Sequence, residues 1–305
     1  MKVFFAAKPA LWDSWAPALT AAMPELDLRR DGDPAIFDGV IYAPGYPEDG
    51  SPMDFTPFVN ARIVQSLWAG VERIVGNATL TQPLCRMVDP GLERGMVEYC
   101  TGWAMRAHLG MDAYVQDGAW RNDRVPPLAH ERRVTVLGMG ALGTAVAQQL
   151  AGLGFDVTGW SASGKPVAGV TTLGGKDLPR ALQSANILIT LLPDTPQTRD
   201  LMDAARLASL PKGAWIINAG RGTLIDEDAL IKALDNGLGH AVLDVFKTEP
   251  LPRTHPFWSH PRITVTPHIA AETRPITAAR VAVDNLRRAM AGQPLLHQVD
   301  RARGY

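Results

Sequence analysis

The stretch VTVLGMGALG, residues 134–143, decides the fold of this chain. It runs from a short apolar strand into the pattern G-x-G-x-x-G and continues into TAVAQQL at 144–150, which we predict to be a helix. The three glycines alone are a weak signal, but between a strand and a helix they are typical of a dinucleotide-binding turn. Gly138 allows the tight turn, Gly140 lets the backbone approach a pyrophosphate, and Gly143 lets helix and strand pack closely.

We expect the start of this predicted helix to bind the phosphates. Its free N–H groups, with those of Ala141 and Leu142 among them, and the positive end of its dipole attract anions. An ordinary βα turn that happens to be rich in glycine is the alternative.

The strand expected at 155–160 leads to the segment SASGK at 161–165, where the type of dinucleotide is decided. An NAD-binding fold usually carries Asp or Glu about 20 residues past the glycines, where its carboxylate bonds the ribose 2′-hydroxyl. A carboxylate would repel a 2′-phosphate, whereas Ser161, Ser163 and Lys165 can hold one by charge-assisted hydrogen bonds. The segment therefore favours NADP over NAD. Because it lacks an arginine, loose use of NAD stays open.

Composition narrows the classes of protein. The chain has 305 residues, 46% of them hydrophobic, which suits about two domains with large cores. Its net charge of −1 gives no field that would attract nucleic acid or an anionic membrane. The apolar start is too short for a signal peptide, and no run approaches the roughly 18 apolar residues of a membrane span. We therefore expect a cytoplasmic protein without nucleic-acid or membrane partners.

The cysteines and histidines do not form a metal pattern. Cys85 and Cys100 are too few and too far apart for a zinc site, and the seven histidines are scattered. Reduced core thiols are the expected state of the two cysteines in a cytoplasmic protein. We expect no metal.

The chain is predicted to form two α/β units. The first comprises residues 1–98 and 273–305, because the last helix returns to it, and the second comprises 99–272. A long helix at 91–109 bridges them, and the polar segment 117–132 leads to the first strand of the second unit. In the first unit we expect strands at 2–7, 39–42 and 63–68, and helices at 17–23, 57–60 and 276–290.

The second unit alternates strands and helices regularly. Strands are expected at 133–137, 155–160, 186–192, 214–218, 241–245 and 263–266, and helices at 142–152, 178–184, 198–206 and 226–237. This alternation predicts a parallel sheet with right-handed crossovers. The expected fold class is α/β, with two Rossmann-like, doubly wound domains and a cleft between them.

Three chemically useful side chains follow the last three strands of this unit. Arg221 follows 214–218, Glu249 follows 241–245 and His268 follows 263–266. In an open parallel sheet ligands bind beyond the carboxyl ends of the strands, so we expect the three side chains near the nicotinamide ring.

Each of the three suits hydride transfer to a 2-keto acid. His268 can protonate the keto oxygen as a general acid, and Glu249 can hold the imidazole and favour its charged form. Arg221 can bind the substrate carboxylate or keto oxygen with its fork of donors, and Gly220 and Gly222 allow it a tight loop. Taken singly, each residue also has a structural interpretation: a loop histidine, a solvated arginine and a Glu-Pro turn.

The same segments resemble the D-isomer-specific 2-hydroxyacid dehydrogenases, and among these the glyoxylate/hydroxypyruvate reductase A group. The resemblance covers about 134–272 and is carried by the segments at 136–143, 192–198, 217–222, 243–252 and 266–271. It implies that Arg221, Glu249 and His268 bind substrate and relay the proton. It also implies a homodimer, for which the helix at 91–109 is a natural contact.

Further roles follow from the resemblance alone. It implies that Asp244 lies near the nicotinamide carboxamide, although a loop cap is the alternative for this residue. It implies that the amides of Ala69 and Gly70 bind the substrate carboxylate, where a plain turn is the alternative, and that Tyr42 closes over the substrate. Residues implied to border the cofactor are Leu192, Pro193, Ala219 and Gly220. Members of this group often carry arginines in the ribose loop, where this chain has Ala162 and Gly164.

We therefore predict an enzyme that reduces a small 2-keto acid of the glyoxylate or hydroxypyruvate type with NADPH, or with NADH. Three alternatives stay open. They are a reductase of a larger 2-keto acid, a nucleotide-sensing binding protein or corepressor on the same fold, and an interaction protein with a degenerate fingerprint.

Overall fold

The structure, a computed structural model, describes residues 1–113, 120, 122 and 125–304. Part of the predicted connection at 117–132 therefore lies outside the described residues.

The chain divides into two compact units, Met1–Leu92 with Glu272–Tyr305, and Glu93–Ala271. The first division lies six residues before the predicted one. The start of the bridging helix is held in the first unit, because Asp89 accepts hydrogen bonds from the amides of Gly91 and Leu92 and from the hydroxyl of Thr277.

The first unit is a five-stranded parallel sheet in the order β2-β1-β3-β4-β5. Its strands are β1 (Lys2–Ala6), β2 (Asp27–Arg29), β3 (Gly39–Tyr42), β4 (Val64–Ser66) and β5 (Leu84–Cys85). Helices α1 (Pro9–Ala22) and α7 (Pro275–Met290) pack together over one face through residues such as Leu19 and Leu286. The other face is covered by an aromatic cluster from the loops, including Phe37, Phe55 and Phe58. The last helix thus packs within the first unit.

Two helix predictions in this unit were wrong. Helix α1 begins at Pro9, eight residues before the predicted start, and continues through Pro17. Residues 57–60 form turns instead of a helix, because Phe58 is drawn into the aromatic cluster, where it packs against Phe4. The short strands β2 and β5 were not predicted, since two or three residues carry no readable alternation.

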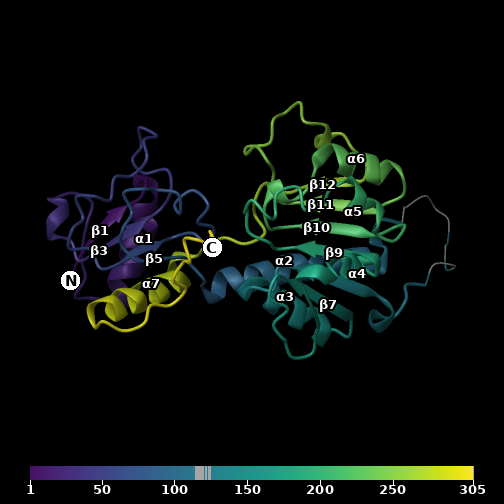
Figure 1. The fold of residues 1–305 in the computed structure, drawn as a ribbon, viewed down its shortest axis with the longest axis horizontal. Coiled ribbons are helices and arrows are strands. Elements are labelled where there is room, and N and C mark those ends of the chain that lie inside the picture. The colour runs from purple at the N-terminus through teal and green to yellow at the C-terminus, as the bar shows by residue number, and fades with distance from the viewer. Residues whose placement is uncertain (114–119, 121, 123–124, 305) are drawn as a thin grey trace. The chain divides into compact units, whose positions relative to one another are not determined.

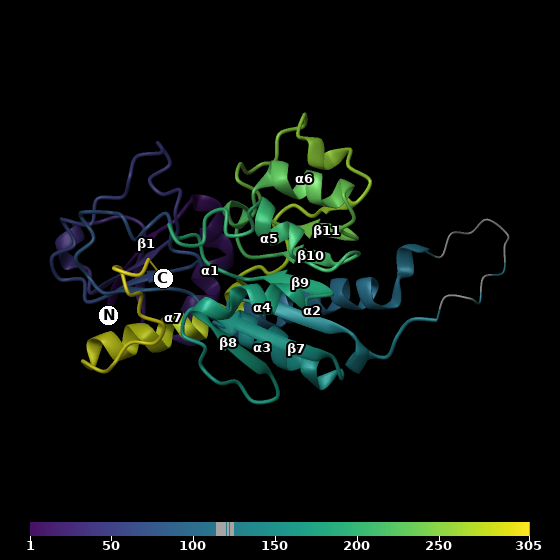
Figure 2. The same ribbon diagram turned by 45° about the vertical axis from the view of Figure 1, so that its right-hand side comes forward.

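The second unit contains a seven-stranded parallel sheet in the order β12-β11-β10-β9-β6-β7-β8. Figure 1 shows β9 to β12 side by side, and Figure 2 shows β8 beside β7 at the other end. Its strands are β6 (Arg133–Leu137), β7 (Asp156–Ser161), β8 (Thr171–Gly174), β9 (Ile187–Thr190), β10 (Trp215–Asn218), β11 (His240–Leu243) and β12 (Ile263–Val265). Counted from β6, six strands have the 3-2-1-4-5-6 order of a Rossmann fold, and β12 extends it.

Helices cover both faces of this sheet. They are α2 (Pro90–Leu109), α3 (Ala141–Gly152), α4 (Leu178–Gln183), α5 (Ala204–Ala208) and α6 (Glu227–Asp235). One core joins the sheet to α2 and α3 through residues such as Cys100 and Val146, and another joins it to α4, α5 and α6 through residues such as Leu207 and Leu230. The predicted α/β class, with two Rossmann-like parallel sheets, is therefore confirmed, and helices cover both faces of the second sheet and one face of the first.

Helix α5 differs from its prediction. It begins at Ala204 instead of 198, because the Asp203 side chain accepts the amide of Arg206 and caps the helix there. The hydroxyl of Thr198 instead donates to the carbonyl of Pro193. Strand β8 was also not predicted. Short 3-10 helices occur at Pro34–Ile36, Met111–Ala113, Ala129–Glu131, Gly175–Asp177, Gly222–Leu224 and Pro256–Trp258.

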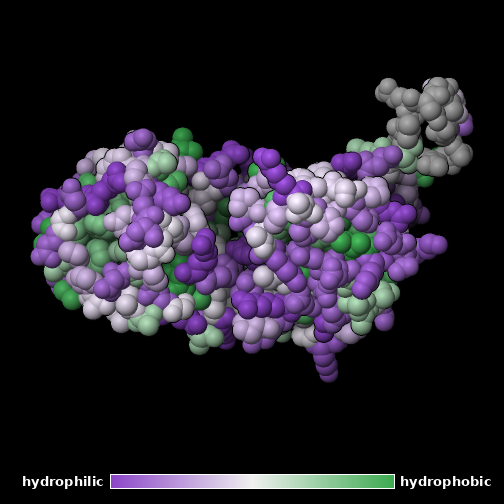
Figure 3. Space-filling view, turned by 90° about the horizontal axis from the view of Figure 1, so that it is seen from above, coloured by the Kyte–Doolittle hydropathy of each residue, from purple (hydrophilic) through white to green (hydrophobic). Residues whose placement is uncertain are grey.

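The surface is mixed. In the face shown in Figure 3, hydrophilic residues predominate and hydrophobic ones form small separate patches. Within the described ranges, no helix combines the length and the apolar character needed to cross a membrane. Across the same part of the chain, no three or more His, Cys, Asp or Glu side chains gather in a way that could hold a metal ion.

Candidate functional site

The turn between β6 and α3 has the geometry that a dinucleotide needs. Gly138 has φ 102°, and a Cβ there would lie 2.6 Å from the carbonyl oxygen of Leu191. A Cβ on Gly143 would overlap the carbonyl of Gly138, so only glycine allows the helix to start so close to the strand. A Cβ on Gly140 would meet no other atom within 4 Å, so that side of the residue is open to a pyrophosphate. The residues present therefore fit a dinucleotide.

Ala141 and Leu142 form the first turn of α3, directly after Gly140. The helix begins immediately after the second glycine of the pattern, one residue before the predicted start at 142. Its first amides have no partner four residues back in the helix and are the donors that an anion uses.

The ribose loop at 161–165 presents hydroxyls and a cation. The hydroxyl of Ser161 accepts the amide of Gly164 at 3.2 Å and lies 3.4 Å from the hydroxyl of Ser163. Ser163 and Lys165 are exposed. The loop holds no carboxylate, so nothing in it opposes a 2′-phosphate.

The loops that follow β9 and β10 adjoin each other. A Cβ on Gly220 would lie 2.9 Å from the carbonyl oxygen of Thr190. Leu192 and Ala219 are buried, and Pro193 is half-buried. These four predicted cofactor neighbours, Leu192, Pro193, Ala219 and Gly220, thus lie at the carboxyl edge of the sheet, next to the glycine-rich turn through the contact of Gly138 with Leu191.

His268 and Glu249 form a hydrogen-bonded pair. Nδ1 of His268 lies 2.8 Å from Oε2 of Glu249, and the other carboxylate oxygen accepts the amide of Phe246 at 2.9 Å. The side chain of His268 is 53% exposed and that of Glu249 35%. With Nδ1 engaged by a carboxylate, Nε2 is the nitrogen that faces a ligand.

The loop that carries His268 is held by Asp244. The main chain of His268 has φ 54°, which a residue other than glycine rarely adopts. Beneath it, the buried carboxylate of Asp244 accepts the amides of Ile269 and Ala270, each at 2.9 Å, and the hydroxyl of Thr266 at 2.6 Å. These bonds fix the direction in which the imidazole leaves the loop.

A tyrosine on α2 extends this network. The hydroxyl of Tyr99 lies 2.7 Å from that of Thr266. Because the Thr266 proton is engaged by Asp244, Tyr99 is the donor to Thr266. Burial raises the pKa of Tyr99 above its usual range, so its hydroxyl keeps this proton.

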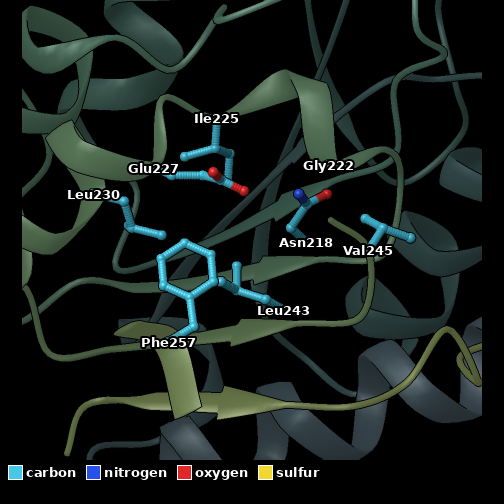
Figure 4. A pocket seen from close by; sticks show the side chains of 8 residues that line it. All are labelled: Asn218, Gly222, Ile225, Glu227, Leu230, Leu243, Val245 and Phe257. Atoms are coloured by element: carbon cyan, nitrogen blue, oxygen red, sulfur yellow. The ribbon is translucent and has the colours of Figure 1, made fainter. Parts of the chain in front are cut away.

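The Arg221 loop is held by Asn218, the last residue of β10. Its amide group donates to the carbonyl of Arg221 at 3.1 Å, and its oxygen accepts the amide of Gly220 and the hydroxyl of Thr190. Nη1 of Arg221 itself donates to the carbonyl of Gly220 at 2.6 Å. In Figure 4, Asn218 and Gly222 lie at one side of a small pocket, opposite Leu230.

The three loops that carry Arg221, Glu249 and His268 are joined. A Cβ on Gly222 would overlap the backbone of Phe246, so the Arg221 loop rests on the loop of Glu249. Glu249 in turn bonds both Phe246 and His268. The structure thus gathers the three predicted residues on neighbouring loops at one edge of the sheet.

Sequence reasoning missed Asn218, Thr266 and Tyr99. Asn218 and Thr266 stand beside predicted residues at the ends of β10 and β12, and polar residues ending apolar strands were the available signal. Tyr99 lies 167 residues before Thr266 in the sequence, and the residues around it form no pattern that indicates a role in the site.

The substrate candidates of the first unit have different environments. Tyr42 is 5% exposed and packs edge-on against Phe55, so it belongs to the aromatic cluster. Ala69 and Gly70 are half-exposed. They follow a turn fixed by Ser66, whose hydroxyl accepts the amide of Trp68 at 3.0 Å.

Known proteins resemble this chain in sequence and in fold. A model of the family described as D-isomer specific 2-hydroxyacid dehydrogenase, NAD binding domain, matches residues 103–270. The glyoxylate/hydroxypyruvate reductase A of Yersinia enterocolitica is 36% identical over 319 residues, covering 99% of this chain and 97% of the relative. The chain belongs to the D-isomer-specific 2-hydroxyacid dehydrogenase family.

Solved structures of this family of oxidoreductases superpose over the whole chain. A D-isomer specific 2-hydroxyacid dehydrogenase from Xanthobacter autotrophicus Py2, in complex with NADPH and MES, has a TM-score of 0.91 and 39% identity, covering 100% of this chain and 99% of that one. The NADPH-dependent glyoxylate/hydroxypyruvate reductase of Sinorhizobium meliloti, in complex with NADP and sulfate, has a TM-score of 0.86 and 32% identity, with the same coverage.

Proposed function

We propose that this protein reduces glyoxylate or hydroxypyruvate to the 2-hydroxy acid, with NADPH as the preferred reductant. The observation that carries the proposal is the 2.8 Å bond between His268 and Glu249, on loops adjoining the Arg221 loop at the carboxyl edge of a dinucleotide-binding sheet. Family membership supports the reaction class, and the names of the reductase A relatives support the substrates.

His268 is the proposed proton donor. When bound, the reduced nicotinamide would supply the hydride that is added to the keto carbon, and the keto oxygen takes up a proton to become the hydroxyl group. Nε2 of the imidazolium can give this proton, while Glu249 accepts the hydrogen bond from Nδ1–H and stabilises the charged ring. The exposed side chain leaves room for a small acid beside it.

Arg221 is the proposed ligand of the substrate's anionic groups. Its guanidinium carries five donors in a planar fork, which matches a carboxylate. The Nη1 bond to Gly220 fixes one edge of the fork, and Asn218 fixes the main chain from which it extends. A clamped acid is oriented for reaction, which contributes several orders of magnitude in rate. Tyr42, Ala69 and Gly70 stay candidates for substrate binding.

The preference for NADPH rests on the ribose loop. Ser161, Ser163 and Lys165 offer two hydroxyls and a cation, and the loop has no carboxylate to repel a phosphate. The superposable Xanthobacter and Sinorhizobium enzymes contain NADPH or NADP. We therefore expect NADH to be used more slowly.

A two-by-two rate assay tests the proposal. The loss of nicotinamide absorbance is followed with NADPH or NADH, and with glyoxylate or hydroxypyruvate. We expect fast oxidation of NADPH with at least one of the two acids. His268→Gln should lower kcat by about 10² or more, because general acid catalysis contributes roughly that factor, and should leave the Kd for NADPH unchanged.

The assay also separates the alternatives. Binding of NADPH without turnover of either acid would contradict the proposed substrates. Activity with a panel of larger 2-keto acids would then identify a reductase of another acid. Inactivity across that panel, with intact cofactor binding, would favour a nucleotide-sensing protein.

We also propose that the protein is a cytoplasmic homodimer. Cys85 and Cys100 are buried free thiols, which suits a reducing compartment such as the cytoplasm.

Apolar side chains that follow α2 are exposed, among them Met111 at 48%, Trp120 at 91% and Val125 at 84%, as expected of a surface that a second copy covers in a homodimer. Light scattering of the purified chain tests the dimer. A monomer at micromolar concentration would contradict it.

A further inference from the structure

The ribose loop cannot hold an arginine at position 164. Gly164 has φ 58°, and a Cβ there would lie 2.9 Å from Cα and 3.1 Å from the amide nitrogen of Gly174. These are backbone atoms, which cannot move aside as a flexible side chain does. Only glycine fits at this position, because the loop packs closely against the end of β8.

This packing brings a second segment to the loop. In the pairing of β7 with β8, Ser161 is opposite Gly174. The pairing continues past the strands, because the amide of Gly175 donates to the carbonyl of Ala162 at 3.4 Å. The short helix Gly175–Asp177 thus begins directly beside the ribose loop.

Trp160 fixes this helix in place. Its indole N–H, buried at the end of β7, is shared between the carbonyls of Gly174 and Gly175, at 3.2 Å from each. The indole comes from the residue just before the loop, so loop and helix share one anchor. Their spacing is therefore set by packed backbone and a buried ring.

Lys176 is the residue that this arrangement places next to the loop. Lys176 follows Gly175, whose amide bonds the carbonyl of Ala162, so the main chain of Lys176 lies one residue from a direct contact with the loop. Its side chain is exposed, and within the described ranges it has no hydrogen-bond or ion-pair partner. The adjacent carboxylate of Asp177 does not engage it. Lys165, at the end of the loop, is exposed and, among the residues that the structure describes, equally without a partner.

We infer that Lys176 is the second cation of a 2′-phosphate subsite and, with Lys165, determines the preference for the phosphorylated dinucleotide. A phosphate monoester carries a charge of about −1.5 to −2 at pH 7, more than Lys165 neutralises by itself. The helix after β8 supplies the charge that Ala162 and Gly164 do not. The inference rests on the proposed use of NADPH, and it assigns that selectivity to a residue outside the ribose loop.

Equilibrium binding tests the inference without any need for turnover. The Kd values of NADPH, NADH, 2′,5′-ADP and 5′-ADP are measured for the wild-type chain and for Lys176→Ala. We expect the variant to bind NADPH and 2′,5′-ADP about tenfold more weakly, within the range that one charged hydrogen bond contributes, and the two unphosphorylated ligands within about twofold of the wild type. Lys176→Arg, which keeps the charge, should restore most of the selectivity.

Lys212→Ala is the matched control. Lys212 is an exposed lysine of the same unit that precedes β10, at the amino edge of the sheet, so its loss should change none of the four Kd values. Equal weakening of phosphorylated and unphosphorylated ligands in Lys176→Ala would overturn the inference, and so would an unchanged Kd for NADPH. A wild-type chain that binds NADPH and NADH equally would overturn it too. Selective binding without reduction of any keto acid would instead count against the proposed reaction.

Discussion

The main-chain N–H of His268 donates to the main-chain carbonyl of Asp244 at 2.9 Å, while the carboxylate of Asp244 accepts the amides of the next two residues, Ile269 and Ala270. One buried residue thus holds the backbone on both sides of a positive φ angle. The cost of that backbone conformation, about 1–3 kcal/mol for such residues, is offset by bonds that leave the imidazole a single direction. Asp244 is in this structure a loop anchor, the alternative left open by the sequence, and a contact with the nicotinamide stays a prediction.

Asp244→Asn distinguishes these two roles. The NH2 group of asparagine is a donor, so it would face the N–H of Ile269 or Ala270 without forming a hydrogen bond. The loss of one to two hydrogen bonds would make the position of the His268 loop less fixed, and we expect kcat to fall by about tenfold. The Kd for NADPH should stay within about twofold, whereas a direct contact with the cofactor would raise it. Asp235→Ala, at an exposed carboxylate of the same unit, should change neither value.

Glu249→Gln removes the carboxylate while keeping the shape of the side chain. The glutamine has one acceptor oxygen for two donors, the amide of Phe246 and Nδ1–H of His268. Either the amide of Phe246 or the charged imidazole of His268 then loses its acceptor. If the imidazole loses it, the charged form of the proton donor is no longer stabilised. We expect kcat to fall by about 10² with little change in stability, measured by steady-state kinetics and thermal unfolding. A kcat within twofold of the wild type would show that the pair is structural.

Asn218→Ala should weaken catalysis through the Arg221 loop. It would leave the buried amide of Gly220 and the hydroxyl of Thr190 without their acceptor, at roughly 1–3 kcal/mol for each group. We expect a lower melting temperature together with a higher KM for the keto acid, because the main chain of Arg221 loses the hydrogen bond from Asn218 that holds it in place. Asn236→Ala, at the end of α6, serves as the control. A loss of stability without any change in KM would limit Asn218 to a structural role.

Stability should fall in mild acid because of histidines that are wholly or partly withdrawn from water. Burial lowers the pKa of His240 from its ordinary value of 6.5, and the ring stacks on Trp215 with centroids 4.7 Å apart. The unfolded chain takes up a proton near pH 6.5 and the folded chain only at lower pH. The free energy of unfolding is therefore undiminished above pH 6.5 and decreases as the pH falls below it.

His240→Gln measures this contribution. Melting temperatures recorded between pH 7.5 and 5 should fall less steeply in the variant than in the wild type. His130→Gln, at an exposed histidine, should keep the wild-type slope. Burial also lowers the pKa of His108, so part of the slope should persist in the variant. An identical slope in His240→Gln and wild type would contradict the assignment.

The sequence alone determined the features that depend on local pattern. The strand–glycine–helix order at 134–150, the regular alternation of the second unit and the residues after its strands were sufficient to predict a parallel sheet and to select Arg221, Glu249 and His268. This was possible because parallel topology sends the carboxyl ends of all strands to one edge, so position in the chain becomes position at the site.

Only the tertiary structure decided how those residues are held. Tyr99, Asn218 and Asp244 act through hydrogen bonds to segments that lie elsewhere in the chain or on a neighbouring loop, and no periodicity encodes such partners. The same is true of Lys176, whose main chain lies beside the ribose loop because Gly164 and Gly174 pack in contact. A one-dimensional pattern records which side chains are available, whereas close packing in three dimensions decides which of them meet.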